Sequence, residues 1–130
     1  GDGVSDINPK EIITLHRKSG AMLTNASKQV ASRFGSMEVE KGGKVKNFTE
    51  KGSNDARINI GYFICEPEVF DFIEEDSDDV QWENGPVVSI AKTGRMFNYD
   101  HTGFWQCMDS VRDKEMLEEM WITQPKWKTW

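Results

Sequence analysis

Apolar residues near the start of the chain recur at the spacing of an amphipathic helix. Asn8 can cap the first turn, Pro9 suits the first helical position, and a glycine at position 20 is a typical terminator. The face that would point to the core carries Ile12, Leu15 and His16. We therefore predict a helix between Asn8 and Gly20, and we interpret His16 as a half-buried surface histidine without a ligand role.

The next thirty residues alternate between short apolar runs and polar stretches. Residues 21–26 indicate a short buried strand, whereas residues 27–32 are polar and irregular, so we predict a loop there. Apolar and charged residues alternate over 37–39, a turn signal follows at 41–44, and residues 45–50 run back. This pattern predicts a β-hairpin.

Residues 58–65 carry apolar side chains at both sets of alternating positions. Ile58, Ile60, Tyr62 and Ile64 form one set, and the residues between them are also mainly apolar. A strand that is covered on both faces has this pattern. We therefore place residues 58–65 at the centre of a sheet with helices packed on it.

The second half of the chain predicts three more helices and one more strand. Glu66-Pro67 begins one helix, residues 86–93 form another, and residues 95–99 form a strand. The last long helix follows residue 109, and its predicted buried stripe consists of Met116, Leu117, Met120 and Trp121. The two tryptophans of the tail, residues 125–130, should pack back on the domain or on another chain.

Helices and strands alternate along the whole sequence, with one hairpin inserted. We therefore predict an α/β fold with a mixed sheet flanked by helices and an inserted β-hairpin, formed as a single domain over residues 1–130.

Composition and charge narrow the classes of function. The 130 residues are 37% hydrophobic and 29% charged, which is typical of a globular protein. A net charge of −6 without a basic stripe argues against a nucleic-acid partner, and no apolar run reaches membrane-spanning length. Cys65 and Cys107 lie in apolar stretches, so we interpret them as buried thiols of a reducing compartment and place the protein in the cytoplasm.

The apolar stretch that begins at Gly103 ends in the carboxylate of Asp109, directly before a predicted helix. Asp109 or Ser110 can cap that helix, which is the usual role of such a residue. A carboxylate at this place can instead hold a hard cation, provided that a second carboxylate meets it. Asp2, near the start of the chain, offers one. On the residues alone, both interpretations of Asp109 stay open.

An ordered set of motifs resembles one enzyme family over essentially the whole chain. In chain order the motifs are Gly1-Asp2-Gly3-Val4-Ser5-Asp6-Ile7-Asn8, Arg33-Phe34-Gly35, Phe48-Thr49-Glu50-Lys51, Ile58-Asn59-Ile60-Gly61-Tyr62-Phe63 and Gly103-Phe104-Trp105-Gln106-Cys107-Met108-Asp109-Ser110. Together with the closing Trp127-Lys128-Thr129-Trp130, they are similar in order and spacing to the C-terminal half of glucose-1-phosphate cytidylyltransferase, a sugar-phosphate nucleotidylyltransferase.

The resemblance implies that a phosphate oxygen of glucose 1-phosphate attacks the α-phosphate of CTP, which forms CDP-glucose and releases pyrophosphate. It also implies Mg²⁺, held by Asp2 and Asp109. By the same resemblance, Lys51 would face the sugar phosphate. The sugar pocket would be lined by Glu50, Asn59 and Gly61. Without the resemblance, these residues are a strand-end acid, a helix cap, two hairpin charges and ordinary sheet residues.

Three functions fit these observations. The first is a fragment or remnant of a glucose-1-phosphate cytidylyltransferase that is inactive as this chain alone, because the 130 residues begin at Gly1 and lack the family's glycine-rich nucleotide-phosphate loop. The second is a stand-alone, non-catalytic interaction domain, and the third is a sugar-phosphate binder without turnover. We also expect a homo-oligomer, since the tryptophan-bearing tail and a half-sheet would expose apolar surface.

Overall fold

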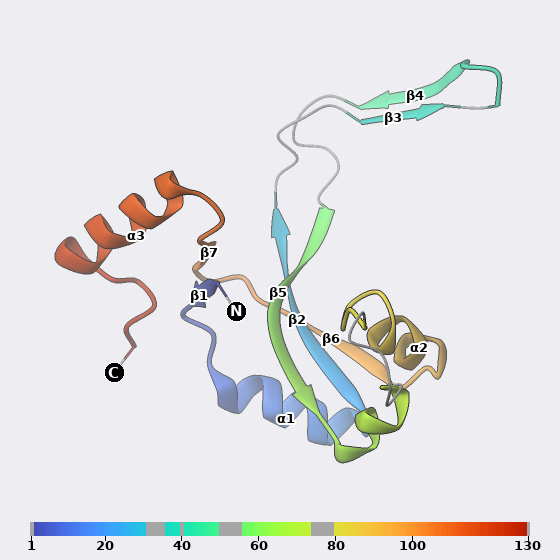
Figure 1. The fold of residues 1–130 in the computed structure, drawn as a ribbon, viewed down its shortest axis with the longest axis horizontal. Coiled ribbons are helices and arrows are strands. Elements are labelled where there is room, and N and C mark those ends of the chain that lie inside the picture. The colour runs from blue at the N-terminus through green and yellow to red at the C-terminus, as the bar shows by residue number, and fades with distance from the viewer. Residues whose placement is uncertain (1, 31–35, 40, 50–55, 74–79, 130) are drawn as a thin grey trace.

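The computed structural model of the protein describes residues 2–30, 36–39, 41–49, 56–73 and 80–129. Over these residues strands and helices alternate, as Figure 1 shows, and the predicted α/β class is confirmed. The elements are β1 (Gly3–Ser5), α1 (Pro9–Ser19), β2 (Leu23–Val30), β3 (Ser36–Val39), β4 (Val45–Thr49), β5 (Ala56–Cys65), the 3-10 helix η1 (Pro67–Phe72), α2 (Pro86–Lys92), β6 (Met96–Asp100), β7 (Trp105–Cys107) and α3 (Val111–Thr123).

The main sheet has three strands in the order β5-β2-β6. β2 pairs with β5 in the antiparallel and with β6 in the parallel direction, so the sheet is mixed, as predicted. The prediction that residues 58–65 form the central strand is wrong. Among the described residues β2 is the central strand of this sheet, and β5 is an edge strand.

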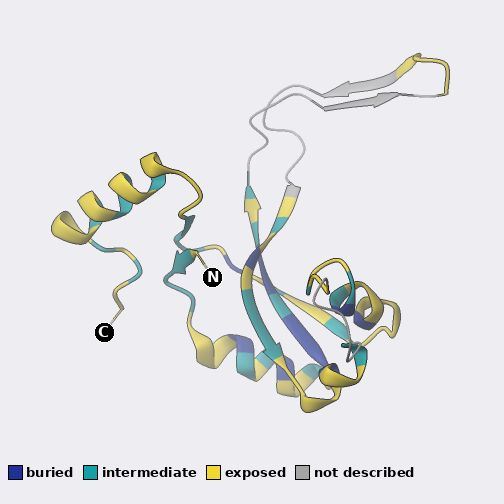
Figure 2. Ribbon diagram, in the orientation of Figure 1, coloured by how far each residue is buried: buried dark blue, intermediate teal, exposed yellow. Residues whose placement is uncertain are grey.

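Helices cover both faces of this sheet. On one face Ile12 of α1 packs in a buried cluster with Ile60 of β5. On the other face Ile90 of α2 packs with Leu23 of β2, and η1 contributes to the same cluster. Figure 2 shows buried residues concentrated along β2, between the two helical layers. Coverage from both sides explains why β5 is apolar on both faces although it is an edge strand.

β2 extends beyond the short strand that was predicted. We predicted a loop over residues 27–32, but residues 27–30 form the second half of β2 and pair with residues 56–59 of β5, while residues 31 and 32 lie outside the described residues. Ser27 also pairs with Asp100 of β6. Backbone pairing with β5 along the segment, and with β6 at Ser27, holds these polar residues extended, and a local hydrophobic pattern cannot predict such pairing.

Two predictions from local signals, α1 and the β3–β4 hairpin, are confirmed. The side chain of Asn8 accepts a hydrogen bond from the backbone N–H of Lys10, and Gly20 ends the helix in the left-handed conformation. β3 and β4 pair in the antiparallel direction. Gly42 and Gly43 in the turn between them have φ angles of 103° and 86°, which few other residues adopt.

His16 is 3% exposed, so the prediction of a half-buried surface histidine is wrong. Its Nδ1 lies 2.9 Å from the hydroxyl oxygen of Thr24 in β2, and its Nε2 lies 3.2 Å from a carboxylate oxygen of Glu66. Because both ring nitrogens have partners, a polar ring is stable in the core at this point. His16 therefore joins α1 to the sheet.

Neither cysteine is fully buried, contrary to the prediction. Cys65 is exposed at the end of β5, Cys107 is half-buried in β7, and both are free thiols. Apolar sequence neighbours do not report burial here, because successive residues of a strand face opposite sides.

α3 lies away from the main sheet in Figures 1 and 2 and contains no buried residue. The predicted buried stripe is therefore wrong: Met116, Leu117 and Met120 are half-buried, and Trp121 is exposed. Of the two tail tryptophans, Trp127 does pack back, since its ring stacks 5.9 Å from that of Phe104 and 6.4 Å from that of Trp121, measured between centroids. Trp130 lies outside the described residues. Within the described ranges no helix has the length and apolar character to cross a membrane.

Candidate functional site

A two-stranded antiparallel ribbon of β1 and β7 brings together segments from opposite ends of the sequence. Its register begins with Gly3 opposite Cys107. One position further, the backbone N–H of Met108 donates to the carbonyl oxygen of Asp2 at 2.9 Å. Asp2 and Asp109 therefore leave the ribbon at the same end.

Asp109 directly precedes Ser110, the residue before α3, and does not cap the helix. The hydroxyl of Ser110 accepts from the backbone N–H of Asp113 at 3.2 Å, and a carboxylate oxygen of Asp113 accepts from the N–H of Ser110 at 3.0 Å. This reciprocal arrangement is a capping box, and the hydrogen bonds from Ser110 lower the pKa of Asp113. Because Ser110 fills the cap position, the carboxylate of Asp109 is not needed to begin the helix.

β5 carries a bulge where it passes the ribbon. Its pairing with β2 shifts in register between Asn25 and Ser27, which lie opposite Phe63 and Asn59. Gly61 lies in the bulge with a φ angle of 82°, a conformation that favours glycine. The N–H of Gly61 donates to the side-chain oxygen of Asn59 at 3.0 Å, so the bulge also orients that amide.

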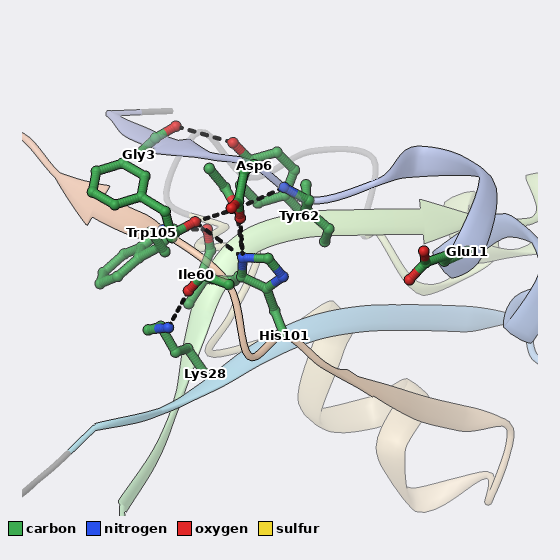
Figure 3. A network of polar contacts seen from close by, with 12 residues as sticks. Gly3, Asp6, Glu11, Lys28, Ile60, Tyr62, His101 and Trp105 are labelled. Atoms are coloured by element: carbon green, nitrogen blue, oxygen red, sulfur yellow. Dashed lines mark hydrogen bonds and ion pairs between the residues drawn. The ribbon is translucent and has the colours of Figure 1, made fainter. Parts of the chain in front are cut away.

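Two aromatic side chains fasten the ribbon to the bulge, as Figure 3 shows. The indole Nε1 of Trp105 donates to the carbonyl oxygen of Ile60 at 3.2 Å, and the hydroxyl of Tyr62 donates to the carbonyl oxygen of Gly3 at 3.3 Å. Burial raises the pKa of Tyr62, which keeps its hydroxyl a donor. A Cβ atom at Gly3 would lie 2.9 Å from Nε1 of Trp105, so the ring packs where a side chain would otherwise stand.

The ribbon and the bulge border an open cleft of about 460 Å³. Its size falls in the ordinary range for small-molecule sites. Four of the residues predicted for the site line it, namely Asp2, Asn59, Gly61 and Asp109. The other two predicted site residues, Glu50 and Lys51, lie outside the described residues.

Sequence reasoning did not select five of the other residues that line the cleft, namely Ile60, Tyr62, Glu83, Trp105 and Cys107. Trp105, Cys107 and Asp109 are spaced by two, so an extended segment there places them on one side, and that spacing was an available signal. A hydrogen bond to the Asp109 carboxylate raises the pKa of the Cys107 thiol. Glu83 comes from the turn before α2, and nothing local marks it.

Two carboxylates in one cleft suit a particular kind of metal centre. In the described part of the chain, no group of three or more His, Cys, Asp or Glu residues is arranged to hold a metal ion. Mg²⁺ does not need such a group, since it keeps several waters and is commonly bound by one or two carboxylates together with substrate phosphates. Asp2 and Asp109 are exposed oxygen donors in the same cleft and fit that pattern.

The mixed sheet flanked by helices and the open cleft with two carboxylates define an α/β domain with an acidic site at one edge. A comparison with protein families identifies it more closely. The family model described as Nucleotidyl transferase matches residues 1–106. The chain therefore belongs to the nucleotidyl transferase family.

Individual relatives agree with this assignment. The glucose-1-phosphate cytidylyltransferase of Salmonella typhi is 39% identical over 132 residues, which cover 100% of this chain and 50% of that protein. The probable glucose-1-phosphate cytidylyltransferase of Bacillus subtilis (strain 168) is 37% identical, with coverage of 100% and 51%. The chain thus spans about half the length of the curated relatives it matches, and the resemblance to their C-terminal half stays a prediction.

A solved structure supports the fold. A crystal structure from Bacillus anthracis, described as a glucose-1-phosphate thymidylyltransferase in complex with a sucrose, matches with a TM-score of 0.65. The two sequences are 13% identical, and the match covers 92% of this chain and 51% of that chain. At this identity the comparison bears on the α/β architecture alone.

Proposed function

We propose that this chain forms the sugar-phosphate and cation-binding part of a glucose-1-phosphate cytidylyltransferase. The observation that carries the proposal is the single cleft in which Asp2, Asn59, Gly61 and Asp109 meet, in a chain of the nucleotidyl transferase family. Both cysteines are free thiols, which is compatible with the reducing cytoplasm that we propose as its location.

In the proposed reaction a phosphate oxygen of glucose 1-phosphate forms a bond to the α-phosphorus of CTP. The bond from that phosphorus to the bridging oxygen breaks, and pyrophosphate leaves with the electron pair. Mg²⁺ would be held by Asp2 and Asp109 and would offset negative charge on the phosphate oxygens.

The remaining roles belong to side chains around the cleft. Asn59 uses its side-chain oxygen to accept from Gly61, so its amide nitrogen is the end that can donate to a sugar hydroxyl. The bulge at Gly61 leaves space beside that amide because no side chain projects there. By resemblance, Lys51 is proposed to face the sugar phosphate and Glu50 to bind the sugar.

Turnover by the 130-residue chain alone is not expected. The family's glycine-rich loop for the nucleotide phosphates is not among these 130 residues, and without it the leaving pyrophosphate lacks a large electrostatic stabilisation. Incubation with CTP, Mg²⁺ and glucose 1-phosphate, followed by detection of pyrophosphate, should show no metal-dependent release. Turnover that disappears in Asp109→Ala would show that this chain is a complete catalyst.

Binding of glucose 1-phosphate tests the proposed site directly. In calorimetric titrations the wild type should bind glucose 1-phosphate more tightly with Mn²⁺ than without it, because a cation held by Asp2 and Asp109 would offset the negative charge of the phosphate. Asp109→Asn should remove this cation dependence. Lys18→Gln on α1, which changes an exposed charge outside the cleft, is the control and should keep it. Equal binding with and without Mn²⁺ in the wild type would contradict the proposal.

A further inference from the structure

A buried histidine lies at the end of the ribbon opposite the two carboxylates. His101 directly follows β6 and is 6% exposed. Its backbone N–H donates to the carbonyl oxygen of Ser27 at 2.8 Å, which continues the pairing of β6 with β2. Its imidazole points toward the link between β1 and α1, where Asp6 lies (Figure 3).

The contacts of the ring determine which nitrogen carries a hydrogen. Nε2 of His101 lies 3.0 Å from the hydroxyl oxygen of Ser5, from a carboxylate oxygen of Asp6 and from the carbonyl oxygen of Phe104. The Ser5 hydroxyl donates its own hydrogen to Phe104 at 2.9 Å and accepts from the N–H of Ile7 at 3.1 Å. Since these oxygens are acceptors toward the ring, Nε2 must be the donor.

These contacts converge on one carbonyl group. Phe104 directly precedes β7. Its carbonyl oxygen accepts hydrogen bonds from Nε2 of His101, from the Ser5 hydroxyl and, at 3.2 Å, from the backbone N–H of Asp6. The ammonium of Lys28 in β2 donates to the carbonyl oxygen of the neighbouring Gly103 (Figure 3). The turn before β7 is thereby fastened to both the β1–α1 link and the main sheet.

Gly103 is the residue that lets this cluster close. A Cβ atom there would lie 2.3 Å from Oδ1 of Asp6 and 2.8 Å from Cε1 of His101. Its φ angle is not in the left-handed region, so space rather than backbone conformation requires glycine. Oδ1 of Asp6 is buried, and no well-directed hydrogen bond reaches it from the described residues. Nε2 of His101, 3.0 Å away, is the polar group that faces this buried oxygen.

We propose that His101, acting with Asp6, is a positioning residue for the carboxylate pair of Asp2 and Asp109. The ribbon has only three residue pairs, and a two-stranded ribbon of this length is marginal on its own. The cluster around His101 fixes one end of it, and the carboxylates extend from the other. The metal-binding role of Asp2 and Asp109 rests on the proposed function. The attachment of the ribbon by the His101 cluster does not depend on it.

The chain contains one other histidine, which provides a matched control. His16 is as buried as His101 and has two side-chain partners, but it joins α1 to β2 and Glu66, away from the ribbon. In hydrogen exchange measured on peptides, His101→Ala should speed exchange of residues 2–7 and 104–109 by about tenfold relative to α1 and β2. His16→Ala should not show this selectivity. His101→Gln, whose amide can donate from nearly the same place, should restore part of the protection.

Mn²⁺ affinity, measured by calorimetry, provides the second readout. His101→Ala should weaken Mn²⁺ binding by about tenfold because the carboxylates are less well placed, whereas His16→Ala should leave it unchanged. A wild type that binds no Mn²⁺ would refute the metal site of the proposed function, while the exchange measurement would still decide the role of His101.

Two results would overturn the proposal. One is exchange in His101→Ala that matches the wild type or rises equally across the whole chain, which would make His101 an ordinary core residue. The other concerns the wild type and needs no folded variant. Nitrogen NMR should find the hydrogen of neutral His101 on Nε2, and a hydrogen on Nδ1 alone would exclude the arrangement described.

Discussion

The indole Nε1 of Trp105 donates to the carbonyl oxygen of Ile60 at 3.2 Å, and this contact joins the two parts of the candidate site. Trp105 belongs to the ribbon that carries Asp2 and Asp109. Ile60 belongs to the bulged strand that carries Asn59 and Gly61. The distance between the Asp2–Asp109 side and the Asn59–Gly61 side of the cleft therefore depends on a side chain that sequence reasoning did not select.

Trp105→Phe should lower the free energy of unfolding by about 1–2 kcal/mol, because an aromatic ring remains while the Ile60 carbonyl loses its donor. Urea denaturation followed by circular dichroism measures the change. Phe70→Tyr alters an exposed ring on η1, outside the cleft, and is expected to change stability by about 0.5 kcal/mol or less. Equal losses in the two variants would mean that the indole hydrogen bond contributes nothing measurable.

Tyr99 links β6 to α1 in a way that predicts a pH dependence. Its hydroxyl donates to a carboxylate oxygen of Glu11 at 2.6 Å, and this hydrogen bond, followed by burial, raises the pKa of Tyr99 to about 12. Because the folded pKa is above the ordinary value of 10.0, the associated stability is fully present below pH 10 and is lost as the pH rises through about 12.

Tyr99→Phe should therefore lower the free energy of unfolding at pH 8 by about 1 kcal/mol, and the difference from the wild type should vanish at strongly alkaline pH. Urea denaturation at several pH values measures this difference. In a Tyr62→Phe background Tyr99 is the remaining tyrosine, and its ionisation can be followed by ultraviolet absorbance. A midpoint near 10 would contradict the predicted effect of Glu11.

Local signals were enough to predict some elements. Asn8 and Gly20 mark the ends of α1 because capping uses only neighbouring backbone groups. The hairpin follows for the same reason from the turn at Gly42 and Gly43. In the site, Asp2 and Asp109 were predicted from the ordered motifs of the family resemblance. The pairing of β1 with β7 brings these two positions, which are far apart in the sequence, to the same end of the ribbon.

Other features depend on contacts between distant segments. Ser27 is polar yet buried, because pairing with both β5 and β6 holds its backbone in the sheet. The spacing of apolar residues in α3 predicts which face of the helix could be buried, but it does not identify the surface that would bury it. His101 and Trp105 likewise act through partners that lie far away in sequence, so a local pattern cannot reveal them.

α3 supports the prediction of a homo-oligomer. Ile122 is 83% exposed and lines a shallow groove of about 430 Å³ together with Met108, Lys114, Leu117, Glu118, Trp121 and Trp127. In a two-fold contact the same surface of both copies meets itself, and the apolar side chains of this groove could cover one another in that way, so we expect a second copy of this chain to cover it. Sedimentation at micromolar concentration should show a dimer for the wild type and a monomer for Ile122→Glu.

Val88→Glu is the control for this measurement, because Val88 is an exposed apolar residue on α2, outside the groove. It should remain dimeric. A clean wild-type monomer, or binding of a different protein in place of a second copy, would contradict the prediction.

Mg²⁺ or Mn²⁺ should raise the melting temperature slightly, because a cation that binds only the folded state stabilises it by mass action. Asp109→Asn should abolish this response, since an amide replaces a carboxylate ligand. Ser110→Ala is the matched control: it removes the cap of α3 and costs about 1 kcal/mol, but it keeps both carboxylates and should keep the response. Thermal melts with and without cation compare the three proteins. If Asp109→Asn still responds to the cation, Asp109 is not a ligand and the proposed metal site is wrong.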